Sequence, residues 1–200
     1  MDSGATGDGL RERGKAKRRA AITRAAFELF AAQGYDATTI AEIAALAEVS
    51  PRTVTLYFRS KQDIAFADFD ASALRLTETL RDRAAGESVV HALEGWLRAG
   101  TACHDETREL ELRMFEANPE LRAVRAARMA AAMEEGARVI AEATGRAPDG
   151  IASRLVATAA AAMVTEIFQS PDGTERDQAV GVAMAFLTAG IEAVAAPAPR

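Results

Sequence analysis

Cysteine is almost missing from this chain of 200 residues. Cys103 is the only one, so no disulfide can form within the chain. A lone thiol is typical of proteins that work in a reducing compartment. We therefore expect a cytoplasmic protein.

Long apolar runs and secretory signals are missing as well. The first nine residues are polar and no apolar segment follows them, so we expect no signal peptide. The longest alanine-rich stretch, residues 156–164, is shorter than the roughly 20 residues that a membrane-spanning helix needs. Neither strand-like alternation nor a repeat is present. The expectation is a chain with no membrane partner.

Histidine is scarce, which argues against catalysis and metal binding. His91 and His104 are the only two, and no HExxH or CxxC pattern occurs. Cys103 and His104 are adjacent, but neighbouring residues on a helix point about 100° apart. They therefore cannot form a nucleophilic pair with each other. The sequence predicts no enzyme, no metal site and no cofactor.

Alanine, in contrast, is abundant, and only six prolines are present. Alanine is the best helix former, so we predict an all-α fold. Apolar periodicity, caps and breakers predict about nine helices. We place them at about residues 17–33, 39–47, 50–58, 62–84, 88–97, 107–116, 119–143, 149–169 and 173–195.

The charge is unevenly distributed along the chain, whose net charge is −5. Residues 1–61 hold ten Lys and Arg against seven Asp and Glu, whereas residues 62–200 hold fourteen against twenty-two. Such asymmetry indicates a basic binding head on an acidic body. The predicted organisation is a disordered extension over residues 1–14, a head over residues 15–61 and a larger helical domain over residues 62–200.

Residues 39–61 have the pattern of a helix-turn-helix. Thr39 and Glu42 match a capping box, and Ser50 followed by Pro51 suits the start of a second short helix. That helix carries Arg52, whose side chain can read guanine, among small hydroxyl residues that suit phosphate oxygens. The alternative is that these residues only cap and pack helices.

The segment over residues 20–63 resembles the DNA-binding domain of the TetR family of regulators. The matching motifs are FxLF, GYDATT, IAxxA, VSxxT and YFxSK. The resemblance implies an all-α homodimer with a three-helix DNA-binding head and a larger ligand-binding and dimerisation domain. It also implies that the last two helices of each subunit form an intermolecular four-helix bundle, and that ligand binding moves the fourth helix and releases the operator.

The resemblance assigns roles by motif position. Phosphate contacts fall on Thr39, Thr53, Tyr57 and Lys61. Contacts with base edges fall on Pro51, Arg52 and Thr55. The basic residues Lys15, Lys17, Arg18 and Arg19 are expected at the DNA backbone or in the minor groove. Two positions depart from the family: Glu48 stands where glycine is common, and Thr55 stands where tyrosine is common.

The effector pocket is predicted from large apolar and sulfur-bearing residues of the acidic body. The candidates are Trp96, Cys103, Met114, Phe115, Met133 and Met163. The alternative is that they are plain core. Residues 108–124 resemble actinobacterial members similar to the mycofactocin-system regulator, which implies an acyl-CoA-like or other extended hydrophobic ligand.

The dimer interface is predicted on the last two helices. The first would contribute Leu155, Ala159, Ala162, Met163 and Phe168. The second would contribute Val180, Met184, Leu187, Ile191 and Val194. The alternative for each residue is the core of its own subunit.

The predicted function is therefore a one-component transcriptional repressor. It would bind palindromic double-stranded operator DNA as a homodimer and leave it when a small hydrophobic ligand binds. The alternative is a helical small-molecule-binding or scaffolding protein without DNA-binding activity, which would show no salt-dependent DNA binding.

Overall fold

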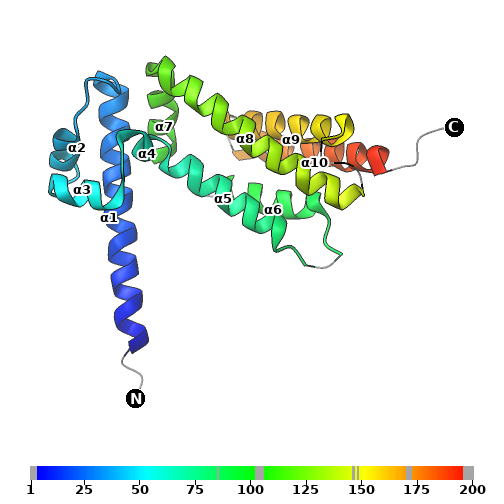
Figure 1. Cartoon of the computed structure of the whole chain (residues 1–200), viewed down its shortest axis with the longest axis horizontal. Helices are drawn as coiled ribbons and strands as arrows, with labels where there is room; N and C mark the ends of the chain where they lie inside the picture. The colour runs from blue at the N-terminus through cyan, green and yellow to red at the C-terminus, as the bar shows by residue number, and fades with distance from the viewer. Residues whose placement is uncertain are drawn as a thin grey trace. The chain divides into compact units, whose positions relative to one another are not determined.

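A computed structural model describes residues 4–84, 86–101, 106–145, 147, 149–169 and 173–195 of the chain. The described residues form ten α-helices and no strand, so the predicted all-α fold is confirmed (Figure 1). The helices are α1 (Gly4–Gln33), α2 (Ile40–Leu46), α3 (Pro51–Tyr57), α4 (Lys61–Ala65), α5 (Ala67–Arg81), α6 (Val89–Thr101), α7 (Glu106–Ala117), α8 (Pro119–Thr144), α9 (Ile151–Gln169) and α10 (Gly173–Ala195).

The chain divides into two compact units, and neither is one continuous segment. The first unit is Met1–Asp70 with Asp105–Arg125, and the second is Ala71–His104 with Ala126–Arg200. The predicted boundary between the head and the larger helical domain was at residue 61. The division differs because α7 packs on α1 and so belongs with the N-terminal helices.

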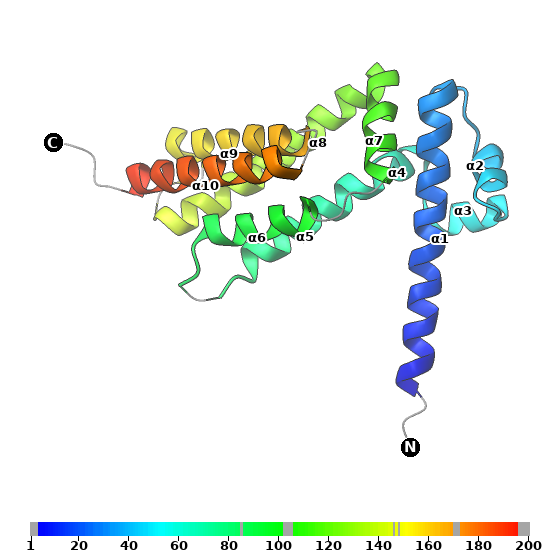
Figure 2. The same ribbon diagram turned by 180° about the vertical axis from the view of Figure 1, so that it is seen from behind.

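Helix α1 organises the first unit. It lies against α7 on one side and against α2 and α3 on the other, as both views show (Figures 1 and 2). Phe27, Phe30 and Phe66 are fully buried in this core, together with Met114 of α7. The helix ends at Gln33 because Gly34 takes a φ of 91°, which suits a residue without a Cβ.

Two expectations about helix limits differ from the structure. Helix α1 begins at Gly4, whereas residues 1–14 were expected to be a disordered extension. The predicted helix over residues 62–84 is divided into α4 and α5 at Phe66. Phe66 has a non-helical φ of −108° and ψ of 10°, and its ring is buried 5.5 Å from that of Phe115. The division accounts for ten helices instead of about nine.

The second unit has its own core, formed by α5, α6, α8, α9 and α10. Leu97, Ile167 and Val180 are its most buried large side chains. The Trp96 ring meets the Phe168 ring edge-on at 5.6 Å between centroids. Met184 and Leu187 of α10 are buried in the same core, which contradicts their predicted place in an interface with another subunit.

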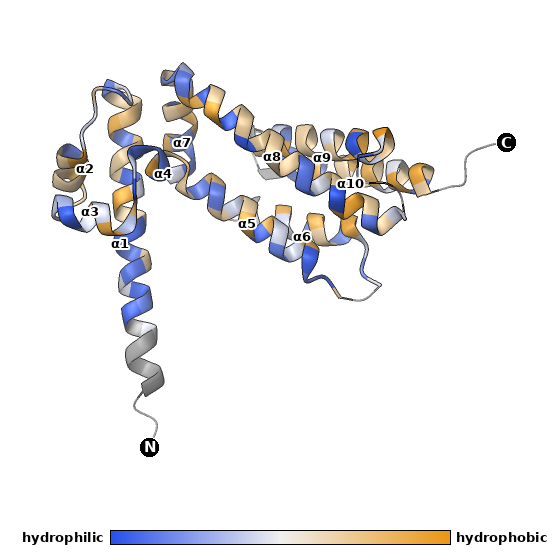
Figure 3. Ribbon diagram, viewed as in Figure 1, coloured by the Kyte–Doolittle hydropathy of each residue, from blue (hydrophilic) through white to orange (hydrophobic). Residues whose placement is uncertain are grey.

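Helices α9 and α10 are unusually apolar for their exposure (Figure 3). Each contains a window with a mean hydropathy of 1.5 that is long enough to cross a membrane, of which only 22% is buried. No segment of that length was expected from the sequence, because neither helix contains an uninterrupted apolar run of about 20 residues. Ile151 and Leu155 of α9, and Val182 and Phe186 of α10, are exposed large apolar side chains.

Candidate DNA-binding surface

The start of α2 is fixed by the predicted capping box. Thr39 Oγ1 accepts from the backbone N–H of Glu42 at 3.2 Å, and the Glu42 carboxylate accepts from the backbone N–H of Thr39 at 2.8 Å. Thr39 Oγ1 also donates to the same carboxylate at 2.8 Å. These hydrogen bonds lower the pKa of Glu42, so the carboxylate beside Thr39 stays ionised.

The turn between α2 and α3 is tight and carries one unfavourable residue. Glu48 has a φ of 55°, in the left-handed region where glycine is easily accommodated. The backbone N–H of Val49 donates to the Ala44 carbonyl at 2.9 Å and closes the turn. Ser50 then caps α3 by accepting from the backbone N–H of Thr53 at 3.1 Å.

Helix α3 buries one side and exposes the other. Val54 is fully buried against the core of the first unit. Pro51, Arg52 and Thr55 are exposed, as base-reading residues must be. The Thr55 hydroxyl donates to the Arg52 carbonyl at 3.0 Å, so its proton is used within the helix.

Leu56 is the residue of this surface that the sequence analysis missed. Its side chain is 82% exposed, more than any other large hydrophobic residue among those described. The signal was present in the sequence: Leu56 follows buried Val54 by two positions, which places it about 200° away around the helix. Leu56 therefore shares the outer face of α3 with Arg52.

Lys61 lies in a different setting from the one expected of a phosphate contact. Its Nζ donates to the carbonyls of Tyr35, Asp36 and Thr38 at 2.6, 3.3 and 2.8 Å, and it lies 4.6 Å from the centre of the Tyr35 ring. An ammonium group has three protons, and these bonds use all of them. Lys61 thus holds the loop between α1 and α2 in shape.

Tyr57 joins the end of α3 to the basic part of α1. The Arg18 guanidinium donates to Tyr57 Oη at 3.5 Å, and the Arg19 guanidinium donates to the Tyr57 carbonyl at 3.4 Å. Arg19 also lies 4.3 Å above the ring of Phe58. Because Tyr57 Oη only accepts in these contacts, its own proton remains available to another acceptor.

The predicted effector residues do not gather in one place. Met114 and Phe115 are in the core of the first unit, whereas Trp96 and Met163 pack with the core of the second. Met133 lies on α8 and is partly exposed. Cys103 lies outside the described residues. The candidates were chosen by their side-chain chemistry, which does not show into which core tertiary packing places each of them.

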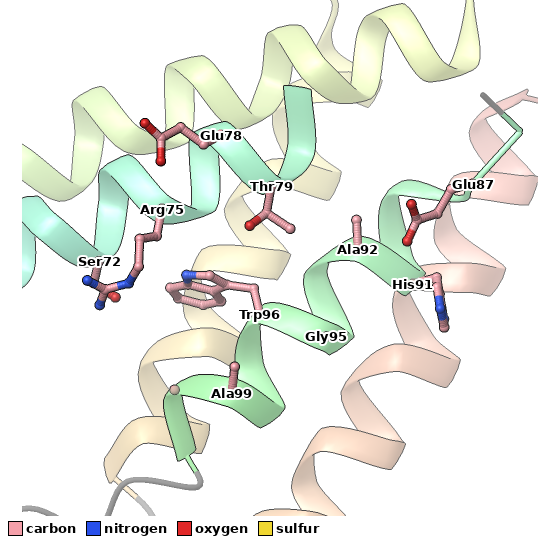
Figure 4. A pocket seen from close by; sticks show the side chains of 11 residues that line it. Ser72, Arg75, Glu78, Thr79, Glu87, His91, Ala92, Gly95, Trp96 and Ala99 are labelled. Atoms are coloured by element: carbon pink, nitrogen blue, oxygen red, sulfur yellow. The ribbon is translucent and has the colours of Figure 1, made fainter. Parts of the chain in front are cut away.

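An open groove of about 630 Å³ lies between α5 and α6 of the second unit, and among the described effector candidates Trp96 alone lines it. Figure 4 shows the Trp96 ring pointing toward Ser72 and Arg75, with Glu87 and His91 at the other end. Glycine and alanine of α6 form much of its floor. The groove combines an aromatic surface with an arginine, and its size suits a small molecule.

Comparison with known proteins agrees with a helix-turn-helix regulator. Residues 22–67 match the family model described as bacterial regulatory proteins, tetR family. The HTH-type transcriptional regulator TcmR of Streptomyces glaucescens is 41% identical over 93 residues, which are 46% of this chain and 41% of TcmR. The chain thus matches about two-fifths of the length of that curated relative. Residues 22–67 are thus similar to the tetR family, and the chain is similar over part of its length to a helix-turn-helix regulator.

Solved structures share the fold at low sequence identity. GusR of Salmonella enterica is 20% identical with a TM-score of 0.61, over 88% of this chain and 95% of GusR. NalD, the secondary repressor of the MexAB-OprM multidrug efflux pump in Pseudomonas aeruginosa, is 21% identical with a TM-score of 0.61, over 88% and 97%. SmeT, solved in complex with triclosan, is 18% identical with a TM-score of 0.61, over 92% and 99%.

Proposed function

We propose that this protein is a cytoplasmic one-component repressor that binds a palindromic operator as a homodimer and releases it when a small hydrophobic ligand binds. The observation that carries the proposal is the outer face of α3, a capped short helix that exposes Pro51, Arg52 and Thr55. A recognition helix must enter the major groove with such a face outward. The similarity of residues 22–67 to the tetR family and of part of the chain to TcmR supports the same role.

The four residues predicted to contact phosphates differ in whether their donor protons are already used in hydrogen bonds within the protein. Thr39 has its hydroxyl proton on the ionised Glu42, and Lys61 has all three protons on loop carbonyls. Thr53 Oγ1 shares a hydrogen bond of 2.8 Å with Ser50 Oγ. Tyr57 accepts from Arg18, and no described residue accepts its hydroxyl proton. We therefore assign the principal phosphate contact to Tyr57 with Arg18, and to Lys61 and Thr39 a supporting role in the shape of the loop.

The basic part of α1 extends this surface. Lys15, Lys17, Arg18 and Arg19 are all exposed on one helix, and Arg18 and Arg19 are held against the end of α3. Figure 3 shows this part of α1 as strongly hydrophilic. Neutralising phosphates with such residues releases counterions, so binding should weaken steeply as salt rises.

The homodimer is proposed through the exposed apolar side chains of α9 and α10. Leu155 is 61% exposed, and Val182 and Phe186 are 72% and 58% exposed. Helices this apolar rarely stay uncovered in water, and a second copy of the same two helices would bury both faces. Of the predicted interface residues, Leu155 and Ala162 keep their place, while α10 would use Val182 and Phe186 instead of Val180 and Met184.

The effector is proposed to bind in the groove between α5 and α6. Trp96 offers a flat apolar surface, and Arg75 offers a cation at the same end. SmeT, which shares the fold, has been solved with triclosan bound, and that precedent favours an aromatic ligand here. An extended acyl-CoA-like ligand, the other expectation, would have to reach beyond a groove of about 630 Å³.

The decisive test is a gel-shift with a palindrome selected from random DNA by the full chain. Arg52→Ala should weaken binding by about 1–3 kcal/mol and relax the preference at one base pair of each half-site. Arg138→Ala, which removes an exposed arginine of α8, is the matched control and should bind normally. A chain that selects no sequence and shows no salt-dependent binding would instead be a helical ligand-binding protein, and the proposal would be wrong.

A further inference from the structure

The outer face of α3 carries two rows of side chains. Pro51 and Thr55 are four residues apart and form one row, and Arg52 and Leu56 form the other. Three of these four side chains present apolar groups: the Pro51 ring, the Thr55 methyl group and the Leu56 isobutyl group. Because the Thr55 hydroxyl proton is used by the Arg52 carbonyl, Arg52 is the residue among these four that offers free donor groups, and the Thr55 oxygen can only accept.

Among the described residues, none covers the side chain of Leu56. It is 82% exposed while Val54 and Phe58, two residues away on either side, are buried at 0% and 4%. Leaving a leucine in water forgoes the gain from burying it. Leu56 is also absent from both hydrophobic cores. A contact that covers Leu56 would therefore come from outside the described part of the subunit.

The charges around Leu56 favour DNA as that partner. Arg52 lies one turn away on the same helix, Arg59 follows shortly after the helix, and Arg18 and Arg19 are bonded to the neighbouring Tyr57. An apolar side chain on a surface that also carries these arginines suits a polyanion that offers an apolar group. In the major groove the only such group is the C5-methyl of thymine.

Resting on the proposed function, we infer that Leu56 is a specificity-determining residue that contacts the methyl group of a thymine in each half-site. Arg52 reads a guanine, and Leu56 lies about 6 Å further along the helix axis. That distance corresponds to about two base pairs, since the strand rises about 3.4 Å per nucleotide. The preferred half-site should therefore hold a thymine within about two base pairs of the guanine that Arg52 reads.

The experiment replaces each thymine of the selected palindrome in turn by deoxyuridine, which lacks only the methyl group. Full-length wild-type protein should lose about threefold to tenfold in affinity at one thymine of each half-site. Leu56→Ala should bind the thymine duplex that much more weakly and should lose nothing further at the same deoxyuridine. Leu46→Ala, at a 48% exposed leucine of α2 in the same unit, should respond as the wild type does.

Thermal melting of each variant checks that the fold is kept, which is expected because Leu56 is exposed. If wild type and Leu56→Ala respond equally to every deoxyuridine, the inference about Leu56 is overturned while DNA binding stands. If Leu56→Ala changes the oligomeric mass and not the deoxyuridine response, a second copy is the partner and the inference is likewise overturned. If wild type selects no duplex, the proposed function fails and this inference fails with it.

Discussion

Lys61 shows how one side chain can serve structure and binding at once. Lys61→Met keeps the aliphatic stem but removes the ammonium group that donates to the carbonyls of Tyr35, Asp36 and Thr38. We expect the free energy of unfolding to fall by about 1–3 kcal/mol, because these carbonyls lose a charged partner. DNA binding should also weaken for every sequence.

The matched variant is Lys17→Met, which removes one positive charge from an exposed position of α1. It should weaken DNA binding with a similar loss of salt dependence and leave urea denaturation unchanged. Equal stability of the two variants would mean that the three carbonyl contacts contribute little, and that Lys61 acts through its charge alone.

Glu48 is the second residue whose substitution should measurably change the free energy of unfolding. Its φ of 55° is unfavourable for a side chain with a Cβ. Glu48→Gly should raise the free energy of unfolding by about 0.5–1 kcal/mol, after allowing for the greater freedom of glycine in the unfolded chain. Gly34→Ala places a Cβ at a φ of 91° and should have the opposite sign in the same denaturation experiment. A destabilised Glu48→Gly variant would show that the Glu48 side chain has a favourable role.

At the scale of the helix, α7 contains Glu111, whose carboxyl group should make the free energy of unfolding depend on pH. Burial and the nearby charge of Asp68 raise the pKa of Glu111 to about 7, although Arg108 and Arg125 oppose the rise. The folded state then holds a proton on Glu111 that the unfolded state releases near its ordinary pKa of 4.5. Its contribution to stability therefore falls as the pH rises from about 4.5 to about 7.

Glu111→Gln should remove that slope and raise the unfolding free energy at pH 8 by about 1–2 kcal/mol, less than the full shift implies because water partly screens the site. Urea melts of both proteins across pH 5 to 8 measure it. Glu109→Gln, on the exposed side of the same helix, is the control and should leave the slope unchanged. A wild-type slope that survives in Glu111→Gln would assign the titration to another group.

Helix starts were predictable wherever a polar cap precedes an apolar pattern. Thr39 and Ser50 cap their helices as the sequence indicated, because these hydrogen bonds join residues three apart. The division of the predicted fourth helix at Phe66 was not predictable. Its apolar periodicity continues through that point, and the cause is packing against Phe115, a residue far along the chain.

In the candidate site, too, the features set by local sequence were predictable and those set by distant residues were not. The outer face of α3 follows from local periodicity, which also contained the signal for Leu56. Periodicity does not show whether a side-chain donor is already used within the fold. Lys61, for example, bonds to carbonyls more than twenty positions away. From Ala179 onward most positions of α10 are apolar, so periodicity could not say which side would face the subunit's own core.

For the whole molecule, self-association is the property that the exposed face of α10 predicts. Phe186→Glu should shift the protein from dimer to monomer in sedimentation experiments, because two buried carboxylates would have to meet in a symmetric interface. DNA affinity should fall with it, since a palindrome needs two heads. Leu74→Glu, at a 59% exposed leucine of α5, is the control and should stay dimeric. A dimeric Phe186→Glu variant would place the interface elsewhere.

Asn118, at the turn between α7 and α8, has a consequence for protein engineering. Its side-chain amide donates to the carbonyls of Phe30 and Met114 at 2.9 and 2.7 Å and accepts from the backbone N–H of Tyr35 at 2.7 Å. A truncated head that ends after α4 would leave the Phe30 and Tyr35 groups without these partners and expose the side of α1 that α7 covers. Hybrid regulators made by exchanging heads should therefore transplant two segments, residues 1–70 and 105–125, as one cassette.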